Sequence, residues 1–245
     1  MEPRQQGHLS IEDADIYYRI YGKGDRTILL LHGNGEDWTC FLGQIETFAS
    51  EYTVITMDSR GHGKSNCGTC PLTLKQIGRD AVRLLRLLKI PTAILIGFSD
   101  GANIAMEIAL HSTYPLEKLV LAGGNLYPSG VKMSVQLPTI IHHKFFEILA
   151  HFLPRFRQKA DILGLMVHEP NISPKSLHSI SIPTLVLAGE HDMIRAKHTK
   201  LIARSIPESK LVIIPNANHF IFGKWAEQTN RVILDFLNPQ NPYPR

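Results

Sequence analysis

Five residues, GFSDG at 97–101, stand between the apolar run TAILI at 92–96 and the segment ANIAMEIAL at 102–110. The first run has the composition of a buried strand, and the second has the pattern of a helix. A serine between two glycines at such a junction is typical of a very tight turn, because small residues let strand and helix approach closely. The turn pushes the hydroxyl of Ser99 clear of the sheet, so the sequence predicts a nucleophile there.

The same order of strand and helix recurs along the chain. A hairpin is expected at 9–22, and apolar strands are expected at 27–33, 52–58, 92–98, 118–124, 184–190 and 210–215. Helical patterns occupy 36–50, 73–88, 102–112, 196–206 and 222–237. Strands this apolar are covered on both faces, and strands that alternate with helices form a mostly parallel sheet. The sequence therefore predicts an α/β protein with a central sheet flanked by helices.

Residues 126–180 interrupt this alternation. The segment contains no convincing strand, whereas LPTIIHHKFFEILAHFL at 137–153 shows an amphipathic helical pattern that Pro154 ends. An insertion this long between two core strands is often a lid. We therefore expect a core formed by 1–125 and 181–245 with a small helical cap at 126–180. The alternative is a peripheral helical segment that only covers the sheet edge.

Apolar side chains recur at helical spacing within the expected cap helix. The stripe consists of Ile141, Phe145, Ile148, Leu149 and Phe152. Such a stripe is more often packed in a core than exposed to a substrate, so interior packing is the interpretation that we favour. Phe145 and Phe146 are the candidates for a substrate-binding wall on the face toward the active site.

A nucleophilic serine needs a general base and an acid that orients the base. Two apolar strands near the C-terminus end directly before the loops that carry Asp192 and His219. Ligand sites of open α/β sheets lie at the carboxyl ends of their strands. Topology therefore favours Asp192 as the acid and His219 as the base for Ser99, while Glu190 and His191 can be argued as substitutes.

An oxyanion beside Ser99 needs two N–H donors. The glycine-rich turn HGNGED follows the first parallel strand, and we expect the backbone N–H groups of Asn34 and Asp100 to be the donors. The helix that begins after Ser99 also directs its positive dipole end at the site. His32 is expected to brace the loop by hydrogen bonding, and a role as a second base is the lesser alternative.

Asp100 places an acidic side chain beside the nucleophile, where a carboxylate opposes the charge of an oxyanion. The side chain either turns to solvent or pairs with a neighbouring base, or it binds a cationic substrate group such as the α-ammonium of an amino-acid ester. The cap argues for anionic ligands, since 126–180 holds six Lys or Arg and three acids. We give more weight to the residue nearest the reaction and treat Asp100 as a candidate substrate-binding residue.

Four stretches taken together, HGNG at 32–35, GFSDG at 97–101, GEHD at 189–192 and NANHF at 216–220, resemble the α/β-hydrolase superfamily. DSRGHGKS at 58–65 and the N-terminal IYYRIYGKGD resemble its further turn and its opening hairpin, so that the resemblance covers nearly the whole chain. The GFSDG elbow is similar to that of the valacyclovir-hydrolase-like and related small carboxylesterase groups. The resemblance implies an α/β-hydrolase fold with a cap and no cofactor. The acid after the serine and the short cap depart from many members.

Composition and short motifs argue against several other classes. The net charge of +4 is spread along the chain, which does not favour nucleic acid. The N-terminus lacks an apolar signal segment, and no run is long enough to span a bilayer, so we expect a soluble cytoplasmic protein without a membrane partner. Cys67 and Cys70 lack a second pair for zinc and are expected to be loop thiols, not a metal or redox site. GHGKS lacks the first glycine of a P-loop, because Asp58 occupies its position.

These observations predict a serine hydrolase that cleaves a small ester, thioester or amide by acyl transfer. Ser99 attacks the carbonyl, His219 transfers the proton, and Asp192 fixes the tautomer of His219. The alternatives are a hydrolase of C–C bonds or lactones that uses the same triad, and a non-catalytic ligand receptor with this fold. A small-molecule substrate is the expected partner, with no cofactor and no metal, and the sequence does not predict the oligomeric state.

Overall fold

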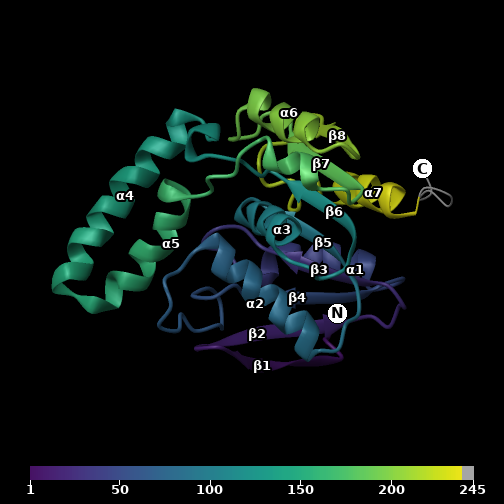
Figure 1. Ribbon diagram of the computed structural model, residues 1–245, viewed down its shortest axis with the longest axis horizontal. Helices are drawn as coiled ribbons and strands as arrows, with labels where there is room; N and C mark the ends of the chain where they lie inside the picture. Colours follow the sequence, from purple (N-terminus) through teal and green to yellow (C-terminus); the bar gives the residue numbers. More distant parts are fainter. Residues whose placement is uncertain (239–245) are drawn as a thin grey trace.

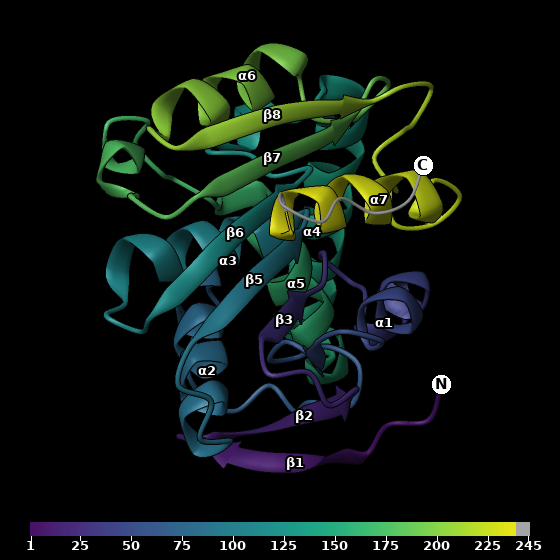
Figure 2. The same ribbon diagram turned by 90° about the vertical axis from the view of Figure 1, so that its right-hand side faces the viewer.

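The computed structural model describes residues 1–238 and has an eight-stranded sheet at its centre (Figure 1, Figure 2). From one edge to the other, the strand order is β1-β2-β4-β3-β5-β6-β7-β8. The strands are β1 Gln5–Ile11, β2 Ala14–Tyr21, β3 Thr27–Leu31, β4 Thr53–Met57, β5 Ala93–Phe98, β6 Leu116–Ala122, β7 Thr184–Gly189 and β8 Ser209–Ile214.

The strand directions agree with those expected from the sequence. β1 pairs antiparallel with β2, and β2 pairs antiparallel with β4, so the expected N-terminal hairpin is present. The pairs from β4 to β8 are parallel. Every residue of β3, β4, β5 and β7 is buried, because helices cover both faces of the sheet. The α/β class and the mostly parallel sheet are therefore confirmed.

Helices form a layer on each face of the sheet. One layer contains α2 Leu74–Leu87, α3 Asp100–His111 and α6 Ala196–Ser205. The other contains η1 Trp38–Phe41, α1 Leu42–Phe48 and α7 Ala226–Leu237. Each helix buries an apolar stripe against the strands, as Ile77, Ala81 and Leu84 of α2 show. Burying one Leu or Ile side chain contributes about 1.5–3 kcal/mol, so these two layers hold the strand ends that carry the loops of the site.

The insertion between β6 and β7 contains two α-helices, where the sequence predicted one. They are α4 Met133–Phe152 and α5 Arg157–His168, accompanied by the short helices η2 Pro128–Gly130, η3 Pro154–Phe156 and η4 Ser176–Ser179. α4 begins before the expected position 137, and Pro138 lies near its start. In Figure 1, α5 lies between α4 and the helices that cover the sheet, so that α4 is outermost. Among residues 1–238, no helix has both the length and the apolar character needed to cross a bilayer.

The expected interior packing of the apolar stripe on α4 is wrong. Ile141, Phe145, Ile148 and Phe152 are exposed, and only Leu149 is partly buried. α4 packs on α5 through its opposite face, whose buried residues are Gln136 and His143. The sequence pattern shows that one face of a helix is apolar, but it does not show which face meets a neighbouring element.

Candidate active site

Ser99 lies at a tight turn between β5 and α3. Its φ of 55° and ψ of −118° are strained for a residue with a side chain. A Cβ on Gly97 would lie 2.2 Å from the carbonyl oxygen of Gly101, and a Cβ on Gly101 would lie 1.9 Å from that of Leu31. Glycine is therefore required at both positions for strand and helix to approach, as the spacing of GFSDG predicts.

Asp192 and His219 are held together on the loops that follow β7 and β8. His219 Nδ1 lies 2.8 Å from Asp192 Oδ1, and both side chains are buried. The Asp192 carboxylate also accepts the N–H of Ile194 at 2.8 Å and the N–H of Gly189 at 3.3 Å. The neutral imidazole therefore carries its proton on Nδ1, which leaves Nε2 as the basic nitrogen.

The Nε2 atom of His219 is buried and has no hydrogen-bond partner among residues 1–238. The imidazole packs against the ring of Phe98 with 5.0 Å between centroids, and Phe98 directly precedes Ser99. A buried acceptor without a partner is costly, so such an atom usually serves a reaction or a ligand. This arrangement places an available base beside the strained turn.

Gly123, which directly follows β6, is a site residue that the sequence analysis missed. It has a φ of 65°, and a Cβ at this position would lie 2.8 Å from Cε1 and 3.0 Å from Nδ1 of His219. The absence of a side chain therefore makes room for the imidazole. The available signal was the pair Gly123-Gly124 directly after a buried strand.

Gly123→Ala is expected to lower kcat/KM about 100-fold. The added methyl group would displace the His219 ring, and a small displacement of the base slows proton transfer from Ser99. The positive φ also costs of order 1–3 kcal/mol, so the melting temperature should fall by several degrees. Gly61→Ala is the matched control, since Gly61 has a φ of 75° and its nearest contact for a Cβ is Cys67 Sγ at 3.3 Å. It should lose stability and keep kcat, and equal kinetic losses in the two variants would contradict the role of Gly123.

Two backbone N–H groups lie unpaired near Ser99. Those of Asn34 and Asp100 donate to no hydrogen bond within residues 1–238, whereas Gly33 N donates to Glu36 Oε2 at 3.1 Å. A Cβ on Gly33 would lie 3.1 Å from Ser99 Cβ, so this loop lies against the serine. Burial raises the pKa of Glu36, an acid that the sequence analysis did not single out. The free N–H groups suit an oxyanion.

The carboxylate of Asp100 is buried and 6% exposed. It accepts hydrogen bonds from Asn34 Nδ2 at 3.0 Å and from Asn103 Nδ2 at 3.3 Å, and burial raises its pKa. The expectations that it turns to solvent or pairs with a base are therefore wrong, while a contact with substrate stays a prediction. Asn34 Nδ2 also donates to the carbonyl of Ile162 on α5 at 2.7 Å, which ties the loop to the insertion.

His32 braces the glycine-rich loop as expected. Its Nε2 accepts the N–H of Ser59 at 2.9 Å, so Nδ1 carries the proton and donates to the carbonyl of Gly33 at 2.8 Å. Burial and the neighbouring His62 lower the pKa of His32 to about 3. Because both ring nitrogens are occupied and the ring stays neutral, His32 does not serve as a second base.

The substitutes considered for Asp192 and His219 lie elsewhere. Glu190 is exposed, and its Oε2 accepts the N–H of Asn216 at 2.8 Å, which links the loops after β7 and β8. His191 is exposed as well. The structure therefore brings Asp192 together with His219 and leaves both alternatives at the surface.

Phe145 and Phe146 lie in a separate place. Together with His142, Lys159 and Leu163 they line an open recess of about 380 Å³ that includes none of the proposed catalytic residues. The structure does not bring them to the serine, and their contact with substrate stays a prediction.

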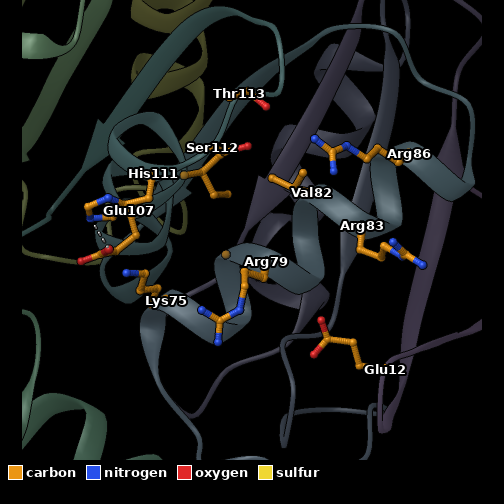
Figure 3. Close-up of a pocket in the computed structure, with 12 residues that line it drawn as sticks. Glu12, Lys75, Arg79, Val82, Arg83, Arg86, Glu107, His111, Ser112 and Thr113 are labelled. Atoms are coloured by element: carbon orange, nitrogen blue, oxygen red, sulfur yellow. Dashed lines mark ion pairs between the residues drawn. The ribbon is translucent and has the colours of Figure 1, made fainter.

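A second recess, of about 340 Å³, lies between α2 and α3 (Figure 3). It is lined by Lys75, Arg79, Arg83 and Arg86 of α2 and by the ion pair of Glu107 with His111 at 3.3 Å. None of the proposed catalytic residues lines it, so its charge says nothing about the chemistry at Ser99.

Comparisons with known proteins agree with the fold described above. A sequence model described as the alpha/beta hydrolase family matches residues 28–232. The chain is 28% identical over 263 residues to 2-hydroxy-6-oxononadienedioate/2-hydroxy-6-oxononatrienedioate hydrolase 2 of Pseudomonas putida, with 92% of each chain covered. It is 26% identical to serine hydrolase BPHL of Homo sapiens, with 94% of this chain and 85% of that protein covered. The enol-lactonase from Burkholderia xenovorans LB400 has the same fold, with a TM-score of 0.80, 20% identity and coverage of 95% and 100%.

Proposed function

Because the chain belongs to the alpha/beta hydrolase family, and is therefore a hydrolase of small molecules, we propose that it is a serine hydrolase of esters, thioesters or amides. One observation carries the proposal. The buried pair of His219 and Asp192 leaves Nε2 without a partner beside the strained turn of Ser99. A general base that takes a proton from a serine hydroxyl needs this arrangement.

In the proposed reaction, Ser99 Oγ attacks the substrate carbonyl while His219 Nε2 takes its proton. Asp192 stabilises the imidazolium that forms, and Nε2 then donates the proton to the leaving group. The resulting acyl-enzyme is attacked by a water molecule that gives its proton to the same nitrogen. Collapse of the second tetrahedral intermediate returns the proton to Ser99 and releases the acid.

The oxyanion of each tetrahedral intermediate would accept hydrogen bonds from the free backbone N–H groups of Asn34 and Asp100. A preorganised donor of this kind is worth about 100- to 1,000-fold in kcat. The N-terminal end of α3 adds its positive dipole at the same place. The strain stored at Ser99 thus has a use, because it aims the hydroxyl and the following N–H at one substrate group.

We propose residues 126–180 as a cap over a core formed by 1–125 and 181–245, of which 239–245 lie outside the residues that the structure describes. The hydrogen bond of 2.7 Å between Asn34 Nδ2 and the carbonyl of Ile162 supports this, because it joins the proposed oxyanion loop to α5. The position of the cap would then bear directly on the geometry of an oxyanion donor. The cytoplasm remains the proposed location, supported by three cysteines that are all unpaired.

The Asp100 carboxylate accepts hydrogen bonds from the side-chain amides of Asn34 and Asn103. These contacts favour a role in supporting the Asn34 loop over direct contact with substrate. Asp100→Ala is expected to lower kcat/KM about tenfold, because Asn34 loses an acceptor that positions it. An α-amino ester and its desamino analogue should be affected equally when both are assayed with the variant and the wild type. A loss confined to the amino ester would instead establish the competing proposal, in which Asp100 binds a cationic substrate group.

Hydrolysis of a C–C bond or of a lactone is the second candidate. It is favoured by the similarity of the chain, at 28% identity, to a protein of Pseudomonas putida that is named as a dienedioate hydrolase. The same triad would serve, since the attacked atom is again a carbonyl carbon. A panel of esters, lactones and vinylogous 1,5-diketones, compared by kcat/KM, separates the two candidates.

A fluorophosphonate probe tests the proposal in its general form. The folded wild-type protein should be labelled covalently, and the labelled peptide should contain Ser99. An unlabelled folded protein would favour the non-catalytic ligand receptor, which has this fold but no turnover.

A further inference from the structure

The solvent-facing side of α4 carries a row of apolar side chains, with the exposed polar residues Ser134, Lys144 and His151 among them. We call this surface the α4 ridge, and its residues, each 50–73% exposed, are Met133, Leu137, Ile141, Phe145, Ile148 and Phe152. The opposite side of α4, which packs on α5, buries the polar residues Gln136 and His143. Figure 1 shows α4 as the outermost element of the insertion. An ordinary surface helix has the reverse arrangement, so the α4 ridge is a candidate contact surface.

We propose that the α4 ridge binds a second copy of this chain, with the two α4 helices antiparallel. A two-fold interface requires reciprocal contacts, so that each pair of facing residues is centred on the same axis. The ridge residues form three such pairs between copies, namely Met133 with Phe152, Leu137 with Ile148, and Ile141 with Phe145. The midpoint of every pair falls at residues 142–143, and one axis therefore serves all three.

The size of the ridge also fits a helix pair. Half to three quarters of six large side chains amounts to roughly 600 Å² per copy. Two copies would therefore bury at most about 1,200 Å², which is the lower end of the range for stable interfaces.

The charges on α4 favour a protein partner over a lipid surface. Its only Lys and its only Glu, Lys144 and Glu147, pair with each other at 2.7 Å. A helix that binds an anionic bilayer carries unpaired cations along its polar face. Within α4 itself the pair of Lys144 with Glu147 leaves no Lys without an acidic partner, and the neighbouring cations Lys132 and Arg155 lie beyond its two ends.

The molecular mass in solution tests the proposal. Light scattering of the wild type at tens of micromolar should give twice the chain mass of 27.5 kDa. Ile148→Asp should weaken self-association at least about 100-fold, because a symmetric interface receives the charge twice in place of an apolar contact. Because the Ile148 side chain is 61% exposed, the Ile148→Asp variant should remain folded, as its melting curve would show.

Leu42→Asp is the matched control, because Leu42 is 57% exposed on α1, away from the ridge, and this variant should remain dimeric. A wild type of single-chain mass, or a folded Ile148→Asp variant that dimerises as the wild type does, would overturn the proposal. Sedimentation of a monomeric wild type with phosphatidylserine vesicles would overturn it in favour of a lipid surface.

Cross-linking tests the antiparallel arrangement. When Met133→Cys and Phe152→Cys are mixed and oxidised, a disulfide should join one variant to the other, and neither variant should be joined to itself at these positions. In an antiparallel pair, two copies of the same end lie roughly 28 Å apart along α4. Mass spectrometry of the linked peptides separates this bond from those of the three native thiols. A bond between two Met133→Cys chains would indicate parallel helices and overturn the arrangement.

Discussion

Ser99→Ala is expected to lower kcat for an activated ester by at least about 1,000-fold and to abolish labelling by a fluorophosphonate. The variant keeps the free N–H groups of Asn34 and Asp100, so it should still stabilise an oxyanion and retain a small activity above that of water. Alanine fits where the Ser99 side chain lies, although the φ of 55° remains strained. Stopped-flow measurement of product release together with intact-protein mass spectrometry gives both readouts.

His219→Ala should cost nearly as much as Ser99→Ala, and the double variant should be no worse than either, because nucleophile and base act as one unit. His191→Ala is the control, since His191 is exposed on the loop that follows β7. It should keep the kcat of the wild type. If Ser99→Ala retained activity within tenfold of the wild type, the reaction would not proceed through this serine.

The nucleophile turn was predictable from the sequence because its constraint is local. Gly97 and Gly101 are needed wherever a strand and a helix meet at such an angle, and the clash that a Cβ would cause arises from the immediate backbone. The positions of Asp192 and His219 were predictable for a different reason. Loops at the carboxyl ends of neighbouring parallel strands meet, so the order of strands alone brings these residues together.

Other features depend on which surfaces meet, and the sequence does not record this. The apolar stripe of α4 was identified, yet the structure turns Phe145 to solvent and places His143 against α5. Asp100 was recognised as unusual, but its partner Asn34 comes from a loop 66 residues away. Gly123 makes room for His219 only because β6 and β8 flank β7 in the sheet. Each of these contacts is decided by tertiary packing.

Asp192→Asn is expected to lower kcat by roughly 1,000- to 10,000-fold, with a melting temperature close to that of the wild type. The amide has the shape of the carboxylate and can keep one of its backbone hydrogen bonds, so the loop after β7 should stay folded. Glu190→Gln is the control, because Glu190 is exposed and holds only the loop at Asn216. Full activity in Asp192→Asn, together with a large loss in Glu190→Gln, would assign the acid to Glu190.

The loss expected in Asp192→Asn follows from the two ways in which an amide can occupy this site. With its oxygen in the place of Oδ1, it accepts from Ile194 and His219, but its NH₂ group then faces the N–H of Gly189. With its oxygen in the place of Oδ2, the NH₂ group faces Nδ1 of His219, which must then carry its proton on Nε2. That tautomer cannot take a proton from Ser99. In both orientations the negative charge that stabilises the imidazolium is gone, so neither restores the rate.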